Sequence, residues 1–332
     1  MTGLRVLVIG GAGYIGSHVC KLLAAAGHSV VVFDNLERGN ADAVKWGRLI
    51  QGDLRNLEEI NNVFSADTYD AVMHFAAYAY VGESVSEPDL YFQNNVGGTL
   101  NLLAAMSRHS VSRLVFSSTC AVYGTPHSVP VTEESPLAPE SPYGASKLMA
   151  EQAIESYARL GCISPVIFRY FNVIGSDPDG EIGEDHEPET HILPIAVEAA
   201  IGERSHFSIY GDDYPTRDGT CIRDYVHVND LARAHILALT HTPELGRHVF
   251  NLGTGVPLSV KQILDKVDEV SGSKIQRQVN PRREGDAVSL YATAKKANSV
   301  LNWKPKHTDI SFAVENVIAY VKKKASRATP RH

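Results

Sequence analysis

The feature that most constrains the fold of this chain is a glycine-rich segment, GGAGYIG at residues 10–16, which directly follows an apolar stretch at residues 5–9. The apolar stretch has the composition of a buried β-strand, and the residues after the glycines have the pattern of a helix. Gly10, Gly13 and Gly16 permit a tight turn and let the backbone approach a pyrophosphate at the positive N-terminus of that helix. The segment therefore predicts a strand–turn–helix unit that binds a dinucleotide.

Short β-branched stretches alternate with helical patterns through the first half of the chain. This rhythm is typical of a parallel sheet with helices on both faces, because parallel strands need crossover connections. We predict an α/β fold built on a Rossmann-type, doubly wound parallel sheet. The expected strands are 5–9, 29–33, 71–75, 113–117 and 165–168, and the expected helices include 14–26, 90–107 and 143–160.

The pattern changes after about Asn172, where a polar stretch rich in glycine and proline is followed by short elements in no regular order. This change predicts a smaller C-terminal α/β lobe that holds the substrate. Residues 228–240 and 249–252 again have the pattern of a helix and a strand, so we expect the chain to return to the sheet there. The predicted units are a Rossmann domain at 1–172 plus about 228–252, a lobe at 173–227 and 253–325, and a basic tail at 326–332.

An acidic residue ends the second predicted strand. Asp34 lies 18 positions beyond Gly16, where a carboxylate can bind the hydroxyl groups of an adenosine ribose. Its negative charge opposes the 2′-phosphate of NADP, so the predicted cofactor is NAD. Asp53 follows the next apolar stretch and is either a contact to adenine or a turn-forming residue.

Tyr143 and Lys147 are candidates for proton transfer because an i, i+4 spacing places both on one face of a helix. The same spacing recurs at 291/295 and 320/324, so spacing alone carries little weight. Only Tyr143 lies downstream of a strand end rich in hydroxyl groups, FSST at 116–119, and opens a helix after a turn-like PESP segment. The charge of Lys147 would favour the phenolate of Tyr143, which predicts that Tyr143 is a general base with a lowered pKa.

Composition argues against several classes of function. The net charge of −7 and the pI near 6.1 argue against nucleic-acid binding. No signal-peptide pattern and no apolar run near the ~20 residues of a membrane span are present, and four scattered cysteines lack the spacing of a zinc site. We therefore expect a cytoplasmic protein with no membrane partner and no metal.

His186 and His191, which lie among carboxylates in DHEPETH, fit neither a helical i, i+4 pair nor a zinc pattern and are expected in a polar loop.

Motifs along nearly the whole chain, from Val6 to about Trp303, resemble those of one enzyme family. They are GGAGYIGSH, DN at the second strand end, HFAA with VGES, NNVxGT, FSSTCAVYG, SPYGASK, RYFN, DGTCIRDYVHVND and RREGD. The glycines and the Tyr/Lys pair resemble the extended short-chain dehydrogenase/reductase superfamily. The later motifs resemble, more narrowly, the UDP-glucose 4-epimerase family.

The resemblance implies a specific reaction. Tyr143 would remove the proton from the sugar 4-hydroxyl while hydride passes from C4 to NAD, giving a 4-keto sugar. Lys147 would hold the nicotinamide ribose, and Thr119 would hydrogen-bond the reacting oxygen. The keto sugar would then present its other face and take the hydride back, so that UDP-glucose and UDP-galactose interconvert and NAD is regenerated.

The resemblance also implies which residues bind the two ligands. In the Rossmann domain, the predicted NAD contacts are Gly10, Gly13, Tyr14, Ile15, Gly16, Asp34, Asn35, Asp53, Leu54, Phe75, Ala76, Asn94, Tyr143, Lys147 and Tyr170. Around the lobe, the predicted contacts to the UDP-sugar are Thr119, Tyr143, Asn172, His191, Tyr210, Arg223, Arg283, Asp286 and Leu290. Of these, Arg223 suits a diphosphate and Tyr210 is placed to stack on uracil.

Four positions depart from the family's usual pattern or bear on the sugar. Thr119 replaces a serine but keeps the hydroxyl. Ala79 stands where a lysine is common, which removes an expected contact to the cofactor phosphates, and His191 replaces an asparagine near the nucleotide phosphates. Leu290 is intermediate between a tyrosine that narrows the sugar pocket and a smaller residue that admits N-acetylhexosamines. UDP-N-acetylglucosamine, UDP-xylose and UDP-arabinose therefore stay open as alternative substrates.

Two other functions are weighed against epimerisation. A nucleotide-sugar dehydratase of this superfamily would carry an acidic pair directly after the threonine, where this chain has Cys120 and Ala121. A non-catalytic NAD-binding regulator would need neither Tyr143 nor Lys147. Family members pair the helices that correspond to 90–107 and 143–160 across a dimer, so the resemblance implies a homodimer.

Overall fold

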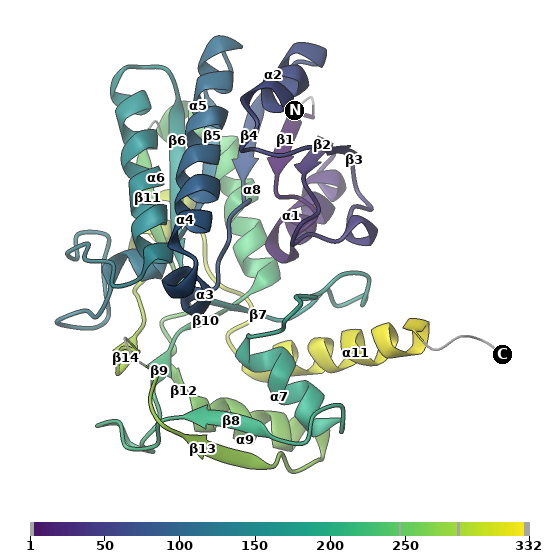
Figure 1. Ribbon diagram of the computed structural model, residues 1–332, viewed down its shortest axis with the longest axis vertical. Coiled ribbons are helices and arrows are strands. Elements are labelled where there is room, and N and C mark those ends of the chain that lie inside the picture. Colours follow the sequence, from purple (N-terminus) through teal and green to yellow (C-terminus); the bar gives the residue numbers. More distant parts are fainter. Residues whose placement is uncertain (1–2, 246, 284–285, 329–332) are drawn as a thin grey trace.

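The computed structural model describes residues 3–245, 247–283 and 286–328 and is built around a seven-stranded sheet (Figure 1). Every neighbouring pair of strands is parallel, and the strand order is β11-β6-β5-β4-β1-β2-β3. This order confirms the predicted Rossmann-type sheet, in which the direction of winding reverses between β1 and β4. The strands are β1 (Arg5–Ile9), β2 (Ser29–Asp34), β3 (Arg48–Gln51), β4 (Ala71–His74), β5 (Arg113–Thr119), β6 (Ser164–Tyr170) and β11 (His248–Leu252).

Helices cover both faces of the sheet because successive residues of each strand point to opposite sides. Val6 and Val8 of β1 pack into a core with α1 (Tyr14–Ala25), α8 (Val228–Leu245) and α10 (Lys295–Leu301). Leu7 and Ile9 pack into a second core on the other face. That face is covered by α2 (Leu57–Ala66), α5 (Gly98–Arg108) and α6 (Pro142–Arg159).

The expected helix at 90–107 is in fact interrupted. It consists of α4 (Pro88–Tyr91), the π-helical turn η2 (Phe92–Gly97) and α5, and it follows the short helix α3 (Val81–Ser86). The buried side chain of Asn95 accepts a hydrogen bond from the Tyr78 N–H and donates to the Tyr78 carbonyl and to Ser146 Oγ, at 2.9, 3.0 and 3.0 Å. These hydrogen bonds connect the π-helical turn to the loop after β4 and to α6. The apolar periodicity of the sequence does not reveal such contacts.

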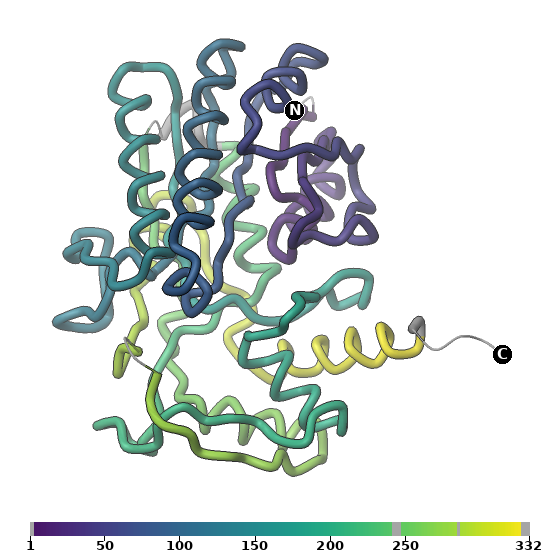
Figure 2. The backbone as a smooth tube through the Cα atoms, viewed as in Figure 1, coloured from purple at the N-terminus to yellow at the C-terminus, as the bar shows by residue number. Residues whose placement is uncertain are grey.

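The chain leaves the sheet after β6, builds part of a second lobe, returns for α8 and β11, and then completes the lobe (Figure 2). The lobe has its own apolar core between its helices and strands β8 and β10. Its elements are β7 (Asn172–Ile174), α7 (Ile192–Ala200), β8 (Phe207–Tyr210), β9 (Ile222–Arg223), β10 (Tyr225–His227), β12 (Leu258–Ser259), α9 (Val260–Ser271), β13 (Arg277–Asn280), β14 (Ser289–Leu290) and α11 (Ile310–Ala328). The short 3-10 turns are η1 (Ala41–Ala43) and η3 (Cys120–Tyr123).

The sequence predicted a basic tail at 326–332 and no segment that spans a membrane. Helix α11 continues to Ala328, so it includes the start of the expected basic tail, and residues 329–332 of that tail lie outside the described residues. Within the described ranges, no helix has the length and apolar character required to cross a bilayer.

Candidate active site

A cavity of about 1570 Å³ lies between the carboxyl ends of the sheet strands and the second lobe. Ligands of open α/β sheets bind at this edge. The cavity is lined by all but one of the residues predicted from the sequence, whose side chains come from both lobes. They are Gly10, Gly13, Tyr14, Ile15, Gly16, Asp34, Asn35, Leu54, Phe75, Ala76, Asn94, Thr119, Tyr143, Lys147, Tyr170, Asn172, His191, Tyr210, Arg223, Arg283, Asp286 and Leu290.

The glycine loop forms the floor of the cavity at the start of α1. Gly10 has a φ of +79°, and a Cβ there would lie 2.4 Å from the backbone nitrogen of Ala76. A Cβ on Gly16 would lie 2.2 Å from the carbonyl oxygen of Gly10. Among the described residues, no side chain caps the start of α1 at Gly13. The first N–H groups of this helix are therefore available to an anion, as a pyrophosphate requires.

Asp34 and Asp53 have different surroundings. Asp34 ends β2, and its carboxylate accepts hydrogen bonds from the N–H groups of Ala12 and Leu36 at 3.0 and 2.9 Å. Burial raises the pKa of Asp34, and these two bonds oppose that effect. Asp53 is the one predicted residue outside the cavity lining, and its carboxylate is held by Arg55 at 2.5 Å, which lowers its pKa. The carboxylate of Asp53 is thus engaged at the edge of the site.

Thr119, Tyr143 and Lys147 come together at the carboxyl end of β5. Thr119 is the last residue of that strand, and its side chain accepts a hydrogen bond from the Ala121 N–H at 3.1 Å. The Thr119 hydroxyl is close enough to Tyr143 to lower the pKa of that phenol. Tyr143 lies in the first turn of α6, and Lys147 follows one turn later. Lys147 is only 3% exposed, and its Nζ lies 4.3 Å from the ring centroid of Phe116. A phenol, a hydroxyl and an amine therefore line the same part of the cavity, where Thr119 and Lys147 are buried and Tyr143 is half-buried.

The pKa values of this cluster differ from the sequence-based expectation. Burial raises the pKa of Tyr143, with smaller contributions from Tyr170 and Cys120, and the bond from Thr119 lowers it. Burial also lowers the pKa of Lys147 to about 7, against the opposing charge of Glu151. Lys147 is not among the groups that shift the pKa of Tyr143 here, so the effect of its charge on the phenol stays a prediction. Spacing alone does not reveal how strongly the two groups are desolvated.

The lobe contributes positive charge to the opposite wall. Arg223 on β9 donates to the carbonyl oxygen of Ala287 at 2.7 Å and pairs with Asp286 at 3.2 Å. The guanidinium of Arg283 lies 3.9 Å from the ring centroid of Tyr210. Two arginines, an aspartate and an aromatic ring are thus positioned together, although they are distant from Tyr143 in the sequence.

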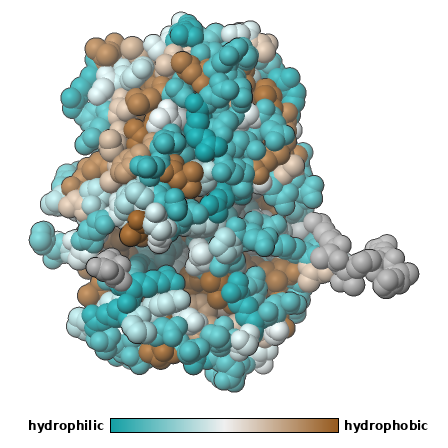
Figure 3. All heavy atoms as spheres, in the orientation of Figure 1, coloured by the Kyte–Doolittle hydropathy of each residue, from teal (hydrophilic) through white to brown (hydrophobic). Residues whose placement is uncertain are grey.

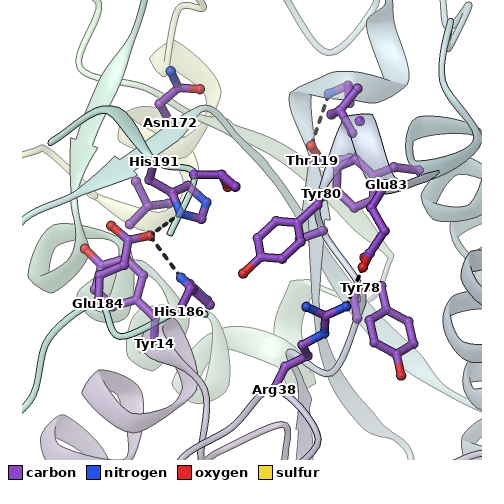
Figure 4. A pocket seen from close by; sticks show the side chains of 18 of the residues that line it. Tyr14, Arg38, Tyr78, Tyr80, Glu83, Thr119, Asn172, Glu184, His186 and His191 are labelled. Carbon is purple, nitrogen blue, oxygen red and sulfur yellow. Dashed lines mark hydrogen bonds and ion pairs between the residues drawn. The ribbon is translucent and has the colours of Figure 1, made fainter. Parts of the chain in front are cut away.

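Sequence reasoning missed a group of side chains that follows strands β2 and β4. Arg38 pairs with Glu83 at 2.5 Å, and its guanidinium lies 5.4 and 5.2 Å from the ring centroids of Tyr78 and Tyr80. All four residues line the cavity, and Figure 4 shows Arg38 reaching toward Glu83. Ala79 stands where related sequences commonly have a lysine, and this was the signal in the sequence that another positive charge could lie near the cofactor. The sequence does not show that Arg38 is that charge, because only the fold places it beside Tyr78 and Tyr80.

His191 also differs from its predicted setting. Its Nδ1 lies 2.9 Å from a carboxylate oxygen of Glu184 and 2.8 Å from one of Glu189. Burial alone would lower the pKa of His191, but the two carboxylates outweigh burial and raise it to about 10. The segment is a loop, as expected. Figure 4 shows Glu184 between His186 and His191, so the polar side chains of this loop form a compact group beside the cavity.

The fold and this cavity define a nucleotide-binding α/β enzyme of the Rossmann type. Its floor takes a dinucleotide, and its Thr–Tyr–Lys cluster can exchange a proton. A sequence profile described as "NAD dependent epimerase/dehydratase family" matches residues 6–253, and this chain belongs to that family.

Individual relatives agree with this assignment and confirm the resemblance found in the sequence. A UDP-glucose 4-epimerase of Rhizobium meliloti (strain 1021) is 48% identical over 317 residues, which cover 95% of this chain and 96% of that protein. The structure of UDP-glucose 4-epimerase from Brucella ovis in complex with NAD has a TM-score of 0.92 at 44% identity, covering 96% of this chain and 98% of that one. The Bifidobacterium longum UDP-glucose 4-epimerase in complex with NAD⁺ and UDP has a TM-score of 0.92 at 36% identity, covering 97% and 99%.

Proposed function

We propose that this chain is an NAD-dependent UDP-glucose 4-epimerase, which inverts C4 of UDP-glucose and UDP-galactose reversibly through a 4-keto intermediate. The observation that carries the proposal is the convergence of Thr119, Tyr143 and Lys147 at the end of β5, in a cavity whose floor is the glycine loop. Relatives crystallised with NAD, and with NAD⁺ and UDP, support the choice of ligands.

The residues of the floor fit NAD. Any Cβ on Gly10 or Gly16 would clash with the backbone of Ala76 or of Gly10, so these glycines allow the tight turn that turns the first N–H groups of α1 toward a pyrophosphate. The carboxylate of Asp34 would accept hydrogen bonds from a ribose and repel an added phosphate. When bound, NAD supplies a reversible hydride acceptor for C4 of the sugar. Lys147, which is only 3% exposed, would hold the nicotinamide ribose.

Tyr143 is the proton acceptor in this scheme. Its Oη takes the proton of the sugar 4-hydroxyl, and Thr119 holds the same sugar oxygen in line through its own hydroxyl. Desolvation disfavours the phenolate form of Tyr143. A positive charge close by would favour that form, and the oxidised nicotinamide and a protonated Lys147 would each supply one. The proton then returns from Tyr143 to the new alcohol when the hydride is given back on the other face.

The lobe binds the nucleotide. Arg223 and Arg283 would make charge-assisted hydrogen bonds to the diphosphate, and Asn172, whose N–H donates to the carbonyl oxygen of Asp224 at 3.1 Å, would add an amide beside Arg223. Tyr210 stacks on uracil once Arg283, which now covers one face of its ring, turns to the phosphates. Binding energy gained on UDP in this way holds the reacting sugar near Tyr143.

The direct test is proton NMR of UDP-galactose incubated with the purified chain and no added NAD. We expect the anomeric signals of UDP-glucose to grow until a stable mixture forms, which requires retained cofactor. A lack of conversion even with NAD supplied would overturn the hexose assignment and would direct the same assay to UDP-xylose and UDP-N-acetylglucosamine. Leu290 lines the cavity, and leucine is intermediate in size between a tyrosine and the smaller residues that admit N-acetylhexosamines.

We also propose that the protein is a cytoplasmic homodimer. The four cysteines are free, as expected in a reducing compartment. The outer faces of η2–α5 and α6 carry uncharged stripes, Gly97–Leu100–Ala104–Ser107 and Ala145–Met149–Gln152–Ser156, in which Leu100 and Met149 are 43% and 46% exposed. Figure 3 shows hydrophobic atoms over the region where α5 and α6 lie in Figure 1. These stripes fit a second copy of the same two helices.

A further inference from the structure

The loop between β7 and α7 contains a short repeat that the proposed reaction does not use. It carries two Glu-x-His units, Glu184-x-His186 and Glu189-x-His191, separated by two residues. In an extended segment, residues i and i+2 point to the same side, so each unit presents a carboxylate and an imidazole together. The fold then brings the two units face to face, which neither a helical spacing nor a zinc-finger spacing would predict.

The four side chains form one compact group. One ligand-capable atom from each of them lies within 4.8 Å of all the others. Nδ1 of His191 lies 2.9 Å from Glu184 and 2.8 Å from Glu189, and Nδ1 of His186 lies 3.4 Å from Glu184. The two imidazole centroids are 5.0 Å apart. A tetrahedral zinc site with bonds of about 2.0–2.1 Å has ligand atoms about 3.3 Å apart, so small side-chain movements suffice.

One atom of the group lacks a good partner. Nδ1 of His186 is buried, and at 3.4 Å the nearest carboxylate oxygen, on Glu184, is too distant for a good hydrogen bond. A buried polar nitrogen without a partner is costly and points to a ligand of its own. The two carboxylates in the same place supply anionic oxygen ligands beside the imidazole nitrogens, and buried carboxylates are typically paired or bound to metal.

We propose that Glu184, His186, Glu189 and His191 bind one divalent transition-metal ion of the zinc type. Two imidazole nitrogens with two carboxylate oxygens suit Zn²⁺ or Co²⁺ and disfavour Mg²⁺, which needs oxygen ligands in an octahedral arrangement. This assignment gives His191 a role different from the phosphate contact implied by the family resemblance.

Four protein ligands leave no open position, so the site is structural rather than catalytic. The loop packs against residues of the Rossmann domain, since the ring of His186 lies 6.4 Å from that of Tyr14 and 6.0 Å from that of Tyr80. A bound ion would therefore hold this loop of the lobe against the start of α1 and the loop after β4, at the wall of the cavity.

The test uses the full chain after treatment with a chelator, titrated with ZnCl₂ by calorimetry and with CoCl₂ by visible absorption. We expect one Zn²⁺ per chain, a Co²⁺ spectrum typical of tetrahedral coordination, and no competition from Mg²⁺. The double variant His186→Gln/Glu189→Gln should bind Zn²⁺ at least about 100-fold more weakly, since loss of even an outer partner of a ligand costs 10- to 100-fold.

The matched control is His127→Gln/Glu134→Gln, which makes the same chemical change at two exposed loop positions and should bind Zn²⁺ like the parent chain. Circular dichroism of all three proteins checks that they fold. Anomalous scattering at the zinc edge should place the ion among the four side chains. The proposal is overturned if the parent chain binds no Zn²⁺, if both double variants bind it equally, or if the anomalous peak lies elsewhere. None of these readouts depends on turnover, so they are independent of the proposed reaction.

Discussion

At the scale of single residues, the phenol of Tyr143 carries the proposed proton transfer. It is half-buried near Thr119, and desolvation raises its pKa, so it holds its proton more tightly than in water. We expect Tyr143→Phe to lower kcat by about 100- to 10,000-fold, the usual contribution of a positioned general base. NAD should stay bound, because the glycine loop and Asp34 are untouched. The NMR assay gives the rate, and the absorbance of nucleotide released on denaturation gives the cofactor content.

The chain offers its own control for this variant. Tyr291 precedes Lys295 with the same spacing, but it lies outside the large cavity, and its carbonyl oxygen accepts a hydrogen bond from the Val131 N–H. Tyr291→Phe should leave turnover within about twofold of the parent, as surface and edge substitutions usually do. Equal losses in the two variants would mean that Tyr143 acts through stability rather than through chemistry.

The residues of the proposed catalytic cluster could be predicted, but their ionisation could not. Sequence context was enough to choose Tyr143 among three tyrosine–lysine pairs, because a strand end and a helix start surround it. The pKa of Lys147 depends on its burial over Phe116 and on Glu151, and no local pattern reports either. Proximity along a helix is a property of sequence, whereas desolvation is a property of the packed molecule.

At the scale of elements, the ion pair between Arg38 and Glu83 joins the loop after β2 to helix α3, which follows β4. These two segments flank the glycine loop, so the pair spans the proposed dinucleotide site. Contacts with Tyr78 and Tyr80 add to it. Together this half-buried ion pair and the cation–π contacts contribute about 1–2 kcal/mol. We expect Arg38→Gln to speed NAD release roughly 10-fold, measured by trapping released NAD with an excess of a second dehydrogenase.

Arg159→Gln is the matched control for this prediction. Arg159 also pairs with a glutamate, Glu155, but the pair lies on the exposed end of α6. Its loss should leave the release rate unchanged. If Arg38→Gln and Arg159→Gln release NAD at the same rate, the pair between Arg38 and Glu83 does not retain the cofactor.

Regular elements were easier to predict than loops. The helix after the glycine loop and the helix of Tyr143 begin within a residue of their expected positions, because Gly13 and Ser141–Pro142 are recognisable starts. The π-turn at Asn95 was missed, since its cause is a hydrogen bond to Tyr78 from outside the helix. The grouping at 184–191 was missed for a related reason: an irregular loop has no period, and its contacts are set by the lobe that carries it.

At the scale of the whole molecule, the uncharged stripes on α5 and α6 lead to a prediction about assembly. Leu100 and Met149 are exposed apolar side chains near the middle of these stripes. Introducing charge at both, in Leu100→Asp/Met149→Asp, would bury two unpaired carboxylates in a dimer, at a cost of several kcal/mol. We expect this variant to be a monomer and the parent chain a dimer in sedimentation analysis at the same concentration.

Val256→Asp provides the comparison. Val256 is also an exposed apolar residue, at 47%, but it belongs to a loop of the other lobe. This variant should remain a dimer. A dimer in all three proteins would show that another surface mediates assembly, and a monomeric parent chain would refute the dimer itself.

Stability in acid is also a property of the whole molecule, because four histidines are buried in different layers of it. Burial lowers the pKa of His18 and His235 to about 4 and that of His74 and His227 to about 3. An unfolded histidine has a pKa near 6.5, so between about pH 6.5 and 4 the unfolded chain binds protons that the folded chain does not. The contribution of these four histidines to the free energy of unfolding is fully present above that range and falls within it as the pH is lowered, by about 1.4 kcal/mol per pH unit for each histidine.

His235 allows a test of this effect at one site. Its Nδ1 lies 2.9 Å from the Leu231 carbonyl and its Nε2 lies 3.1 Å from Ser117 Oγ, with the ring of Tyr170 6.5 Å away as the facing titratable group. Urea unfolding at several pH values should give His235→Gln a shallower dependence than the parent, by about 1.4 kcal/mol per pH unit between pH 6 and 4.5. His127→Gln, at an exposed loop position, should keep the parent slope. Because the comparison uses slopes, any uniform loss of stability in the variant cancels, and equal slopes for all three proteins would show that His235 is protonated in the folded state.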